Sequence, residues 1–391
     1  MAAQTPLVRF RQDRFAIGFW VDPPLDERAD ERYAEIAAAH FNLVLALFAP
    51  TSQQDQARVL ELCARHDLRA IIACRGPEPA ACVDGPACWG YALQDEPGTG
   101  DFPGLRQRVA ALRAARPGRL AYINLYPGYA DAEQQLGAPS YAEYVRRFVA
   151  EVDVDVLSMD HYPLFTPDSD GRDGYCADLA VMRQHALARG IPFWNFFNAM
   201  PYGPHTDPTE AQLRWQIFAS LAYGARGVLY FCYYTPAGAE FPKGGAIIRR
   251  DGTRTRHYAQ ASRLNQAVAC LGPTLMQLTS TAVLRLGPQD EPAAVLAGSP
   301  LRAIARAAVD PPHDYLIGVF RHADGRRAVL LMNYRFAFSA WPTVQFDAAP
   351  EQVVEICPQT GREVALRDDS PDMDGIQISL DAGEGRLFLL P

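Results

Sequence analysis

The chain has a single lysine, Lys243, and arginine supplies the rest of its permanent positive charge. An enzyme that forms a Schiff base with its substrate needs a lysine amine fixed near the reacting carbon. Lys243 lies instead in a segment rich in glycine, proline and alanine, a composition that predicts a loop. The sequence therefore argues against Schiff-base chemistry of the aldolase type.

Sequence patterns for metal and dinucleotide binding are also missing. The eight cysteines include no CxxC pair and no Cys/His spacing typical of zinc sites. The first expected strand ends in "FWVDPP" rather than in a glycine-rich phosphate-binding turn. We expect no obligatory cofactor and mostly free thiols, although Cys82 and Cys88 flank a Gly-Pro turn and could form a disulfide.

The chain has no long apolar run and no surplus of basic charge. No stretch approaches the ~18 apolar residues that span a bilayer, and the N-terminal segment lacks the apolar region of a signal peptide. The net charge of -8 means that the chain lacks the surplus of positive charge typical of proteins that bind nucleic acid or an anionic membrane. We therefore expect a soluble chain with neither partner, either cytoplasmic or already freed of a signal segment.

What the sequence does contain is a regular alternation of short apolar runs with amphipathic segments of helical period. The expected strands are Phe15 to Val21, Asn42 to Phe48, Arg69 to Cys74, Gly90 to Gln94, Leu120 to Leu125, Val154 to Met159, Pro192 to Phe197 and Gly227 to Tyr233. A helical segment follows every one of these strands except the third, which is followed by a loop. This pattern predicts a (β/α)8 TIM barrel, which typically has about 250 residues.

The last part of the chain shows a different pattern. Beyond residue 280 the helical period disappears, and short strand-like runs are joined by turn pairs such as Asp324-Gly325 and Thr360-Gly361. We predict a barrel domain over residues 1–280 and a small all-β sandwich domain over residues 281–391.

Acidic, amide and aromatic residues stand where the expected barrel strands end. Active sites of such barrels lie at the carboxyl ends of the strands. The residues expected there are Asp22, Asp95, Glu96, Asn124, Tyr126, Asp160, His161, Tyr162, Trp194, Asn195, Asn198 and Tyr233, with Glu240 in the loop after the eighth strand. Carboxylates and amides can bind sugar hydroxyls, and aromatic rings can cover the C–H face of a sugar. The set predicts a carbohydrate site.

Two of these carboxyl groups suit acid/base catalysis. Cleavage of a glycosidic bond uses one protonated and one ionised carboxyl group. Glu96 is the expected general acid, because the adjacent Asp95 and an aromatic environment would raise its pKa. Asp160, from another strand, is the expected partner. Asp22 and Asp95 could equally serve only to stabilise the turns that follow them.

The segments "IGFWVDPP", "WGYALQDEPG", "VLSMDHYP" and "PFWNFFNAMPYG" resemble the barrel glycoside hydrolases of clan A, especially the family 42 β-galactosidase-like group. The resemblance covers the barrel, and the trailing sandwich looks like the family's C-terminal domain. It implies a β-linked substrate and an acid/base glutamate after the fourth strand, which Glu96 matches. The family's second glutamate follows the seventh strand, where "IPFWNFFNAMP" contains no acid.

The missing acid leaves several possibilities open. Asp160 or Glu240 could take its place, or a water could attack in an inverting reaction, which needs carboxyl groups about 6.5–9.5 Å apart rather than about 5–5.5 Å. The chain could also bind carbohydrate without cleaving it. A metal ion held by acids such as Asp22, Glu96 and Asp160 with His161 is a weaker alternative. The favoured hypothesis is a glycoside hydrolase acting on an oligo- or polysaccharide.

Overall fold

The computed structural model describes residues 8–74, 78–167, 169–368 and 374–391. These residues form two compact units. One contains the chain up to Asp207 together with Gly227–Asn265, and the other contains Pro208–Arg226 together with the chain from Gln266 onward. The division into domains at residue 280 stays a prediction.

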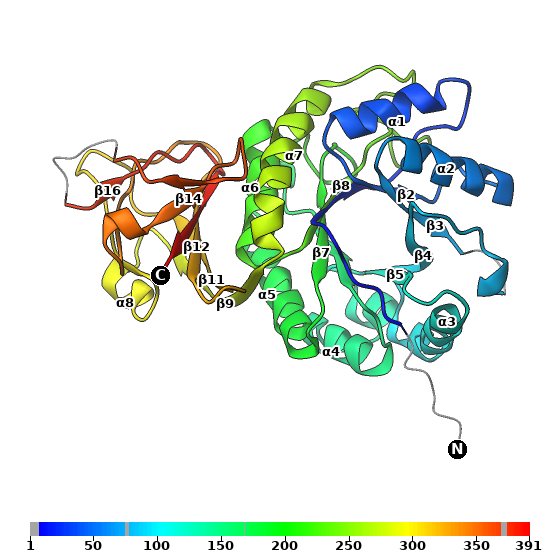
Figure 1. Ribbon diagram of the computed structural model, residues 1–391, viewed down its shortest axis with the longest axis horizontal. Helices are drawn as coiled ribbons and strands as arrows, with labels where there is room; N and C mark the ends of the chain where they lie inside the picture. Colours follow the sequence, from blue (N-terminus) through cyan, green and yellow to red (C-terminus); the bar gives the residue numbers. More distant parts are fainter. Residues whose placement is uncertain (1–7, 75–77, 168, 369–373) are drawn as a thin grey trace. The chain divides into compact units, whose positions relative to one another are not determined.

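The first unit is built on an eight-stranded parallel sheet that curls into a barrel (Figure 1). Its strands are Ala16–Phe19 (β1), Leu43–Ala46 (β2), Arg69–Ala73 (β3), Cys88–Asp95 (β4), Leu120–Leu125 (β5), Leu157–Asp160 (β6), Phe193–Asn198 (β7) and Gly227–Phe231 (β8). The order runs from β1 through β8 and back down to β2. At the seam between β1 and β2, the Asn42 backbone N–H donates to the Ile17 carbonyl at 3.0 Å. The predicted TIM barrel is confirmed.

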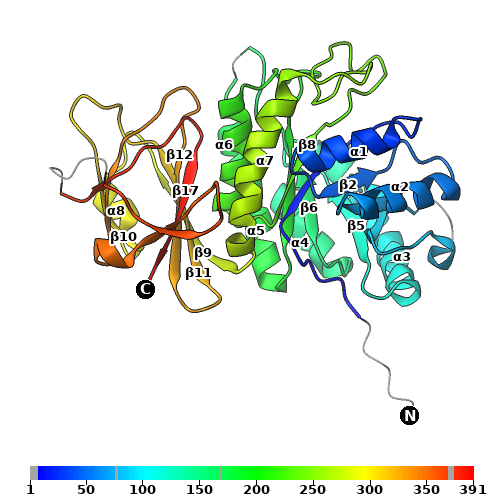
Figure 2. The same ribbon diagram turned by 45° about the horizontal axis from the view of Figure 1, so that its top comes forward.

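Side-chain caps mark the first turn of three of the α-helices. The α-helices are Ala29–Ala38 (α1), Gln53–Arg65 (α2), Phe102–Ala115 (α3), Tyr141–Glu151 (α4), Arg172–Arg189 (α5), Glu210–Ala222 (α6), Arg256–Leu275 (α7) and Pro292–Leu296 (α8). The three with side-chain caps are α2, α4 and α6. For example, the Ser52 hydroxyl accepts from the Asp55 backbone N–H at 3.1 Å and caps α2. In Figures 1 and 2, α1 to α4 lie outside the ring of strands. Among the described helices, none is both long and apolar enough to cross a bilayer.

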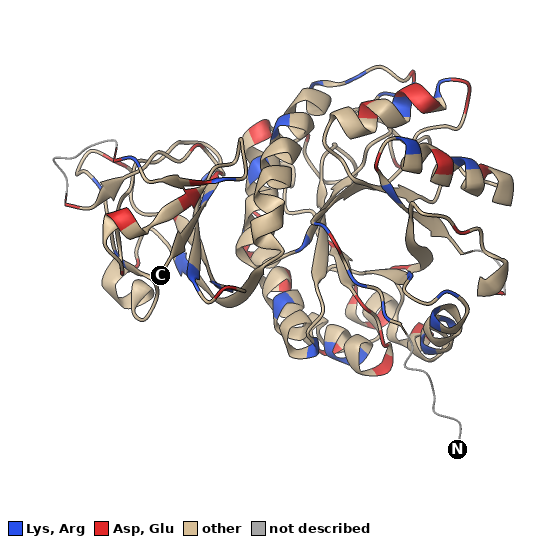
Figure 3. Cartoon of the chain, viewed as in Figure 1, with Lys and Arg blue, Asp and Glu red and all other residues tan. Residues whose placement is uncertain are grey.

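Charge and apolar character separate between the layers of the barrel. Acidic and basic residues are concentrated on the helices and loops, and the strands carry few of them (Figure 3). Aromatic side chains fill the space enclosed by the strands. The ring centroid of Trp194 lies 6.1 Å from that of Trp89 and 6.0 Å from that of Tyr122. The interior around these rings is therefore a packed core, and ligands of such barrels bind at the carboxyl ends of the strands.

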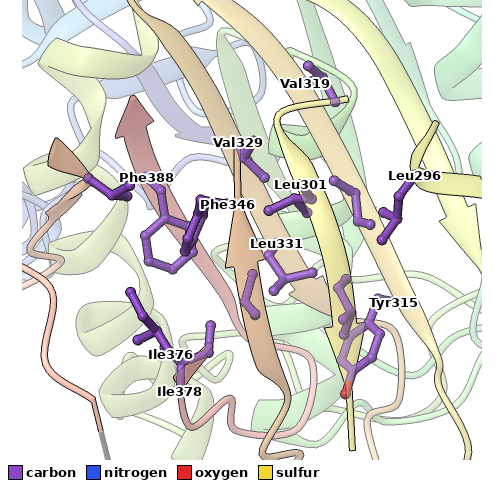
Figure 4. Packing of buried hydrophobic residues seen from close by; sticks show 14 of the residues in the cluster. Leu296, Leu301, Tyr315, Val319, Val329, Leu331, Phe346, Ile376, Ile378 and Phe388 are labelled. Carbon is purple, nitrogen blue, oxygen red and sulfur yellow. The ribbon is translucent and has the colours of Figure 1, made fainter. Parts of the chain in front are cut away.

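The C-terminal strands form two antiparallel sheets, as predicted. The larger has the order β15-β14-β17-β12-β11-β9, and the smaller has the order β10-β13-β16. The strands are Leu278–Leu286 (β9), Leu301–Ala305 (β10), Tyr315–His322 (β11), Arg327–Asn333 (β12), Thr343–Phe346 (β13), Val354–Ile356 (β14), Glu363–Ala365 (β15), Ile376–Gln377 (β16) and Gly385–Leu390 (β17). Figure 4 shows Phe346 beside Phe388 in their core, with ring centroids 5.2 Å apart.

The possible disulfide between Cys82 and Cys88 is not formed in the structure. All eight cysteines are free thiols. The Cys82 sulfur lies 3.0 Å from the sulfur of Cys74, the residue that follows β3. The Cys88 thiol instead approaches the Gly90 carbonyl at 3.6 Å, since Cys88 has become the buried first residue of β4.

Candidate active site

A pocket of about 280 Å³ opens at the carboxyl ends of the barrel strands. Its wall consists of Trp20, Val21, Phe48, Asp95, Glu96, Asn124, Asp160, Tyr162, Phe196, Tyr202, Phe231, Pro236, Glu240 and Phe241. The predicted residues Asp95, Glu96, Asn124, Asp160, Tyr162 and Glu240 are thus brought together from β4, β5, β6 and the loops that follow β4, β6 and β8. Carboxylates and an amide line one part of the wall, and aromatic rings line most of the rest.

Glu96 follows β4 and is held in an unusual backbone conformation. Its φ is +47°, in the left-handed region that costs a non-glycine residue about 1–2 kcal/mol. The Glu96 backbone N–H donates to the Asn124 carbonyl at 2.8 Å, which extends the pairing of β4 with β5 and fixes this conformation. Burial and the neighbouring Asp95 charge raise the pKa of Glu96 to about 7.

A second pocket residue shares this backbone strain. Val21 has φ +64°, which is rare for a β-branched residue, and it follows β1. Four described residues other than glycine have a positive φ, and Val21 and Glu96 are the two that line the pocket. Because strained backbone collects at functional sites, this coincidence marks the pocket as a candidate active site.

Asp160 ends β6 and is the most deeply buried acid of the pocket, with 6 % of its surface exposed. Burial, followed by the charges of Glu96 and Asp95, raises its pKa well above the ordinary value, although hydrogen bonds from Asn124 and Tyr162 act in the opposite direction. The Asn124 amide donates to Asp160 at 2.9 Å and to Asp95 at 3.3 Å. One amide therefore holds two carboxyl groups close to each other.

Three acids of the pocket, Asp95, Glu96 and Asp160, lack a compensating cation in the described part of the chain. Within the described residues, no arginine, lysine or histidine pairs with Asp95, Glu96 or Asp160. Like charges that lie close together in a partly dry site cannot all ionise at neutral pH. The raised pKa values favour retention of a proton among the three carboxyl groups, which is the state that a general acid requires.

Asp95 provides a way to test this electrostatic arrangement. Its charge raises the pKa of both Glu96 and Asp160, so the substitution Asp95→Asn should lower both. We expect the whole pH profile of kcat/KM to move to lower pH by about half a pH unit or more. The profile is measured with any substrate that the protein cleaves. An unchanged profile would show that the Asp95 charge does not affect the pKa of the catalytic groups.

Several predicted residues lie outside the pocket because β7 and β8 present them elsewhere. Trp194 is fully buried one layer deeper, where its indole N–H donates to the Gln12 side chain at 3.0 Å. The Asn195 amide donates to the Tyr175 hydroxyl at 2.7 Å, and the Asn198 amide donates to the Thr206 carbonyl at 3.4 Å. Tyr233 stacks on Phe19 with ring centroids 4.4 Å apart. These four residues therefore do not line the pocket.

Tyr126 and His161 lie near the acids without lining the pocket. Burial and then the Glu96 charge raise the pKa of Tyr126, so this phenol lies close to the candidate acid. His161 is buried, and its Nδ1 lies 2.6 Å from Asp178, which also accepts from the Gly128 backbone N–H at 2.6 Å. His161 therefore holds the chain after β6 in place. The four residues considered for a metal ion do not converge, because His161 and Asp22 are engaged elsewhere.

Asp22 has a structural role in the turn after β1. Its carboxylate accepts from three consecutive backbone N–H groups, those of Leu47, Phe48 and Ala49, at 3.1, 2.9 and 3.2 Å. Burial nevertheless raises its pKa to about 6. Asp22 does not line the pocket, and its contacts support the alternative that it stabilises a turn.

The substitution Asp22→Ala should therefore destabilise the fold. It leaves one buried and two partly buried backbone N–H groups without their acceptor, and we expect the free energy of unfolding to fall by about 2–4 kcal/mol in urea titrations. The matched control is Asp131→Ala, which removes an exposed carboxylate that accepts from the Glu133 and Gln134 backbone N–H groups. That variant should lose at most about 1 kcal/mol. Equal losses in the two variants would contradict the role of Asp22.

Sequence reasoning missed most of the aromatic wall. The missed residues are Trp20, Val21, Phe48, Phe196, Tyr202, Phe231, Pro236 and Phe241. Phe196 and Phe231 could have been found, because each lies two residues beyond an inward-facing core residue of its strand, Trp194 and Leu229. Tyr202 and Phe241 lie in loops, and no periodicity predicts where a loop side chain points.

Comparison with known proteins identifies the fold. No protein-family model and no curated protein sequence matches the chain. A GH42 β-galactosidase from G. stearothermophilus, solved as a catalytic mutant, matches with a TM-score of 0.60 and 10% identity over 97% of this chain and 98% of that chain. A β-galactosidase from Bacillus circulans sp. alkalophilus matches with a TM-score of 0.57 and 10% identity over 97% and 99%. At this identity, the similarity shows that the chain shares their fold.

Proposed function

We propose that the protein is a glycoside hydrolase in which Glu96 is the general acid and Asp160 is its partner carboxylate. One observation carries the proposal: two carboxyl groups, one directly after β4 and one at the end of β6, line one aromatic pocket, both have a raised pKa, and neither pairs with a cation of the described residues. The shared fold with β-galactosidases and the position of Glu96 after the fourth barrel strand support it.

The reaction follows from the two carboxyl groups. Protonated Glu96 donates its proton to the glycosidic oxygen as the bond from that oxygen to the anomeric carbon breaks, and the aglycone leaves as an alcohol. A water molecule supplies a hydroxyl group to the anomeric carbon, and the water's remaining proton returns to a carboxylate of the site. Ionised Asp160 either attacks the anomeric carbon first or takes the proton from that water, and the two routes give opposite anomers.

The pocket indicates a small sugar moiety. Its volume of about 280 Å³ lies just below the range of roughly 300–1,000 Å³ that accepts drug-sized ligands, so we propose that it holds one sugar ring. Asn124 and Glu240 offer hydrogen-bonding groups to hydroxyls, and Trp20, Tyr202 and Phe231 offer ring surface. We take the preference for a β-linkage from the resemblance to family 42 alone.

A panel of alkyl and aryl glycosides tests the proposal. Proton NMR of the first-formed anomer names the sugar and separates the retaining from the inverting route in a single experiment. We expect cleavage of at least one β-glycoside, and we expect that cleavage to be lost in the Glu96→Gln variant. If no glycoside in a broad panel is cleaved, the hydrolase proposal fails.

A barrel that binds carbohydrate without cleaving it is the second candidate. The observation that favours it is the absence of any acid in β7 and in the residues that follow it to Pro201. The two candidates differ in their response to Glu96→Gln. A hydrolase loses turnover and keeps its affinity for the sugar, whereas a binding protein has no turnover to lose and its affinity changes little.

A further inference from the structure

A second cavity adjoins the pocket on the side of β2, β3 and β4. This side cleft has a volume of about 650 Å³. Trp20, Phe48 and Asp95 line both cavities and therefore form the boundary between them. Trp20 and Phe48 pack edge to face there, with ring centroids 5.5 Å apart. A molecule that filled both cavities would pass over this boundary, next to Glu96.

The wall of the side cleft is mainly apolar. Besides the shared residues, it contains Leu47, Ala73, Cys74, Ala92, Leu93 and Tyr122. The first four come from or directly follow strands β2 to β4, and they are small or aliphatic. The described chain between β3 and β4 contains only one short helix, Pro79–Ala81 (η1), where the other strands are followed by long helices.

The polar side chains of the side cleft are few, and three of them, Tyr122, Arg108 and Asp95, each make one contact within the protein. The Tyr122 hydroxyl lies 2.9 Å from the Ser158 hydroxyl, and the Arg108 guanidinium donates to the Leu93 carbonyl at 2.7 Å. Asp95 already accepts from Asn124, and Gln94 is the remaining polar side chain of the wall. A second sugar ring would bring several hydroxyl groups, and burying them beside aliphatic carbon without partners is unfavourable.

We propose that the side cleft binds an apolar aglycone, so that the substrate class is a glycoside of a bulky hydrophobic alcohol rather than an oligosaccharide. This inference rests on the proposed function, since it assigns the sugar to the pocket and the leaving group to the side cleft. The scissile oxygen then lies at the boundary near Asp95, where the adjacent Glu96 donates the proton. The products are the free sugar and the free alcohol, and water is the other reactant.

Two measurements test the inference, and the first requires no turnover. The affinity of 2-naphthylmethanol is measured by calorimetry for the native protein and for Ala92→Phe, whose new ring would fill the side cleft from a partly exposed position on β4. We expect the Kd to rise by about 10-fold or more. Ala111→Phe adds the same ring on the exposed face of α3 and should change nothing. Ala73→Leu serves as a second filling variant if Ala92→Phe does not fold.

The second measurement compares two substrates with equally poor leaving groups. The 2-naphthylmethyl glycoside and a disaccharide of the same sugar and anomeric configuration both release an alcohol, so a difference in kcat/KM reports recognition. We expect the naphthylmethyl glycoside to be preferred by about 10-fold or more and the preference to disappear in Ala92→Phe. A preferred disaccharide, or a naphthylmethanol affinity that neither filling variant lowers, overturns the inference. Cleft-dependent binding without cleavage of either glycoside supports the apolar site and overturns the hydrolase proposal instead.

Discussion

Replacing Glu96 with glutamine is expected to lower kcat for an alkyl glycoside by about 10³-fold, within the range of roughly 10²–10⁴ that general acid catalysis supplies. The amide cannot protonate the departing oxygen, but it occupies nearly the same volume, so affinity for the sugar should be retained. The loss is measured by initial rates at pH 6, where Glu96, with a pKa of about 7, is mainly protonated in the native protein.

The leaving group provides the control for this variant. A dinitrophenolate leaves without protonation, so Glu96→Gln should reduce the first chemical step much less for a dinitrophenyl glycoside than for an alkyl glycoside. Glu133→Gln, an isosteric change at an exposed position, should leave both rates unchanged. An equal loss for both substrates would mean that Glu96 does not act as the proton donor.

The stability of the protein should decrease as the pH rises through the range in which Glu96 ionises. The folded-state pKa of about 7 lies above the ordinary value of 4.5, so the unfolded chain loses this proton first. Where the folded state binds more protons, the free energy of unfolding falls with increasing pH. The contribution of the Glu96 proton to the free energy of unfolding is fully present below about pH 4.5 and is lost as the pH rises through about 7. The shift sets an upper bound of about 3 kcal/mol, which we reduce to about 2 kcal/mol because the side chain is only partly buried.

Glu96→Gln should therefore be more stable than the native protein by about 2 kcal/mol at pH 8 and equally stable at pH 4. Asp160→Asn should act in the same direction, because its pKa is also raised by burial and by like charges. Urea denaturation at both pH values measures the effect, and Glu133→Gln is again the control. A variant that is less stable than the native protein at pH 8 would show that the carboxylate is a structural partner rather than a strained functional group.

The sequence was sufficient to predict the barrel, because its strands and helices differ in hydrophobic period and each is bounded by clear turn or capping residues. Glu96, Asp160 and Asn124 could be placed at one end of the barrel from their positions after β4, on β6 and on β5. The predictions for the residues of β7 failed because the sequence does not show how deep each side chain lies or which face of the strand it occupies. Trp194 points inward but lies one layer too deep, and Asn195 points outward to Tyr175.

The features that distinguish the pocket are long-range and could not be predicted from local patterns. The positive φ of Glu96 depends on the hydrogen bond to Asn124, and the role of Asp22 depends on three N–H groups from the chain after β2. The side cleft depends on how Arg108 of α3 approaches β4. Each of these contacts joins segments that are far apart along the chain.

The most direct test of the shared pocket is a carbon-13 NMR titration of the side-chain carboxyl groups in the native protein and in Glu96→Gln. We predict a pKa of about 7 for Glu96 in the native protein, and a pKa of Asp160 that is well above its ordinary value and falls when Glu96 loses its charge. A Glu96 pKa near 4.5, together with an Asp160 titration that Glu96→Gln leaves unchanged, would contradict the account.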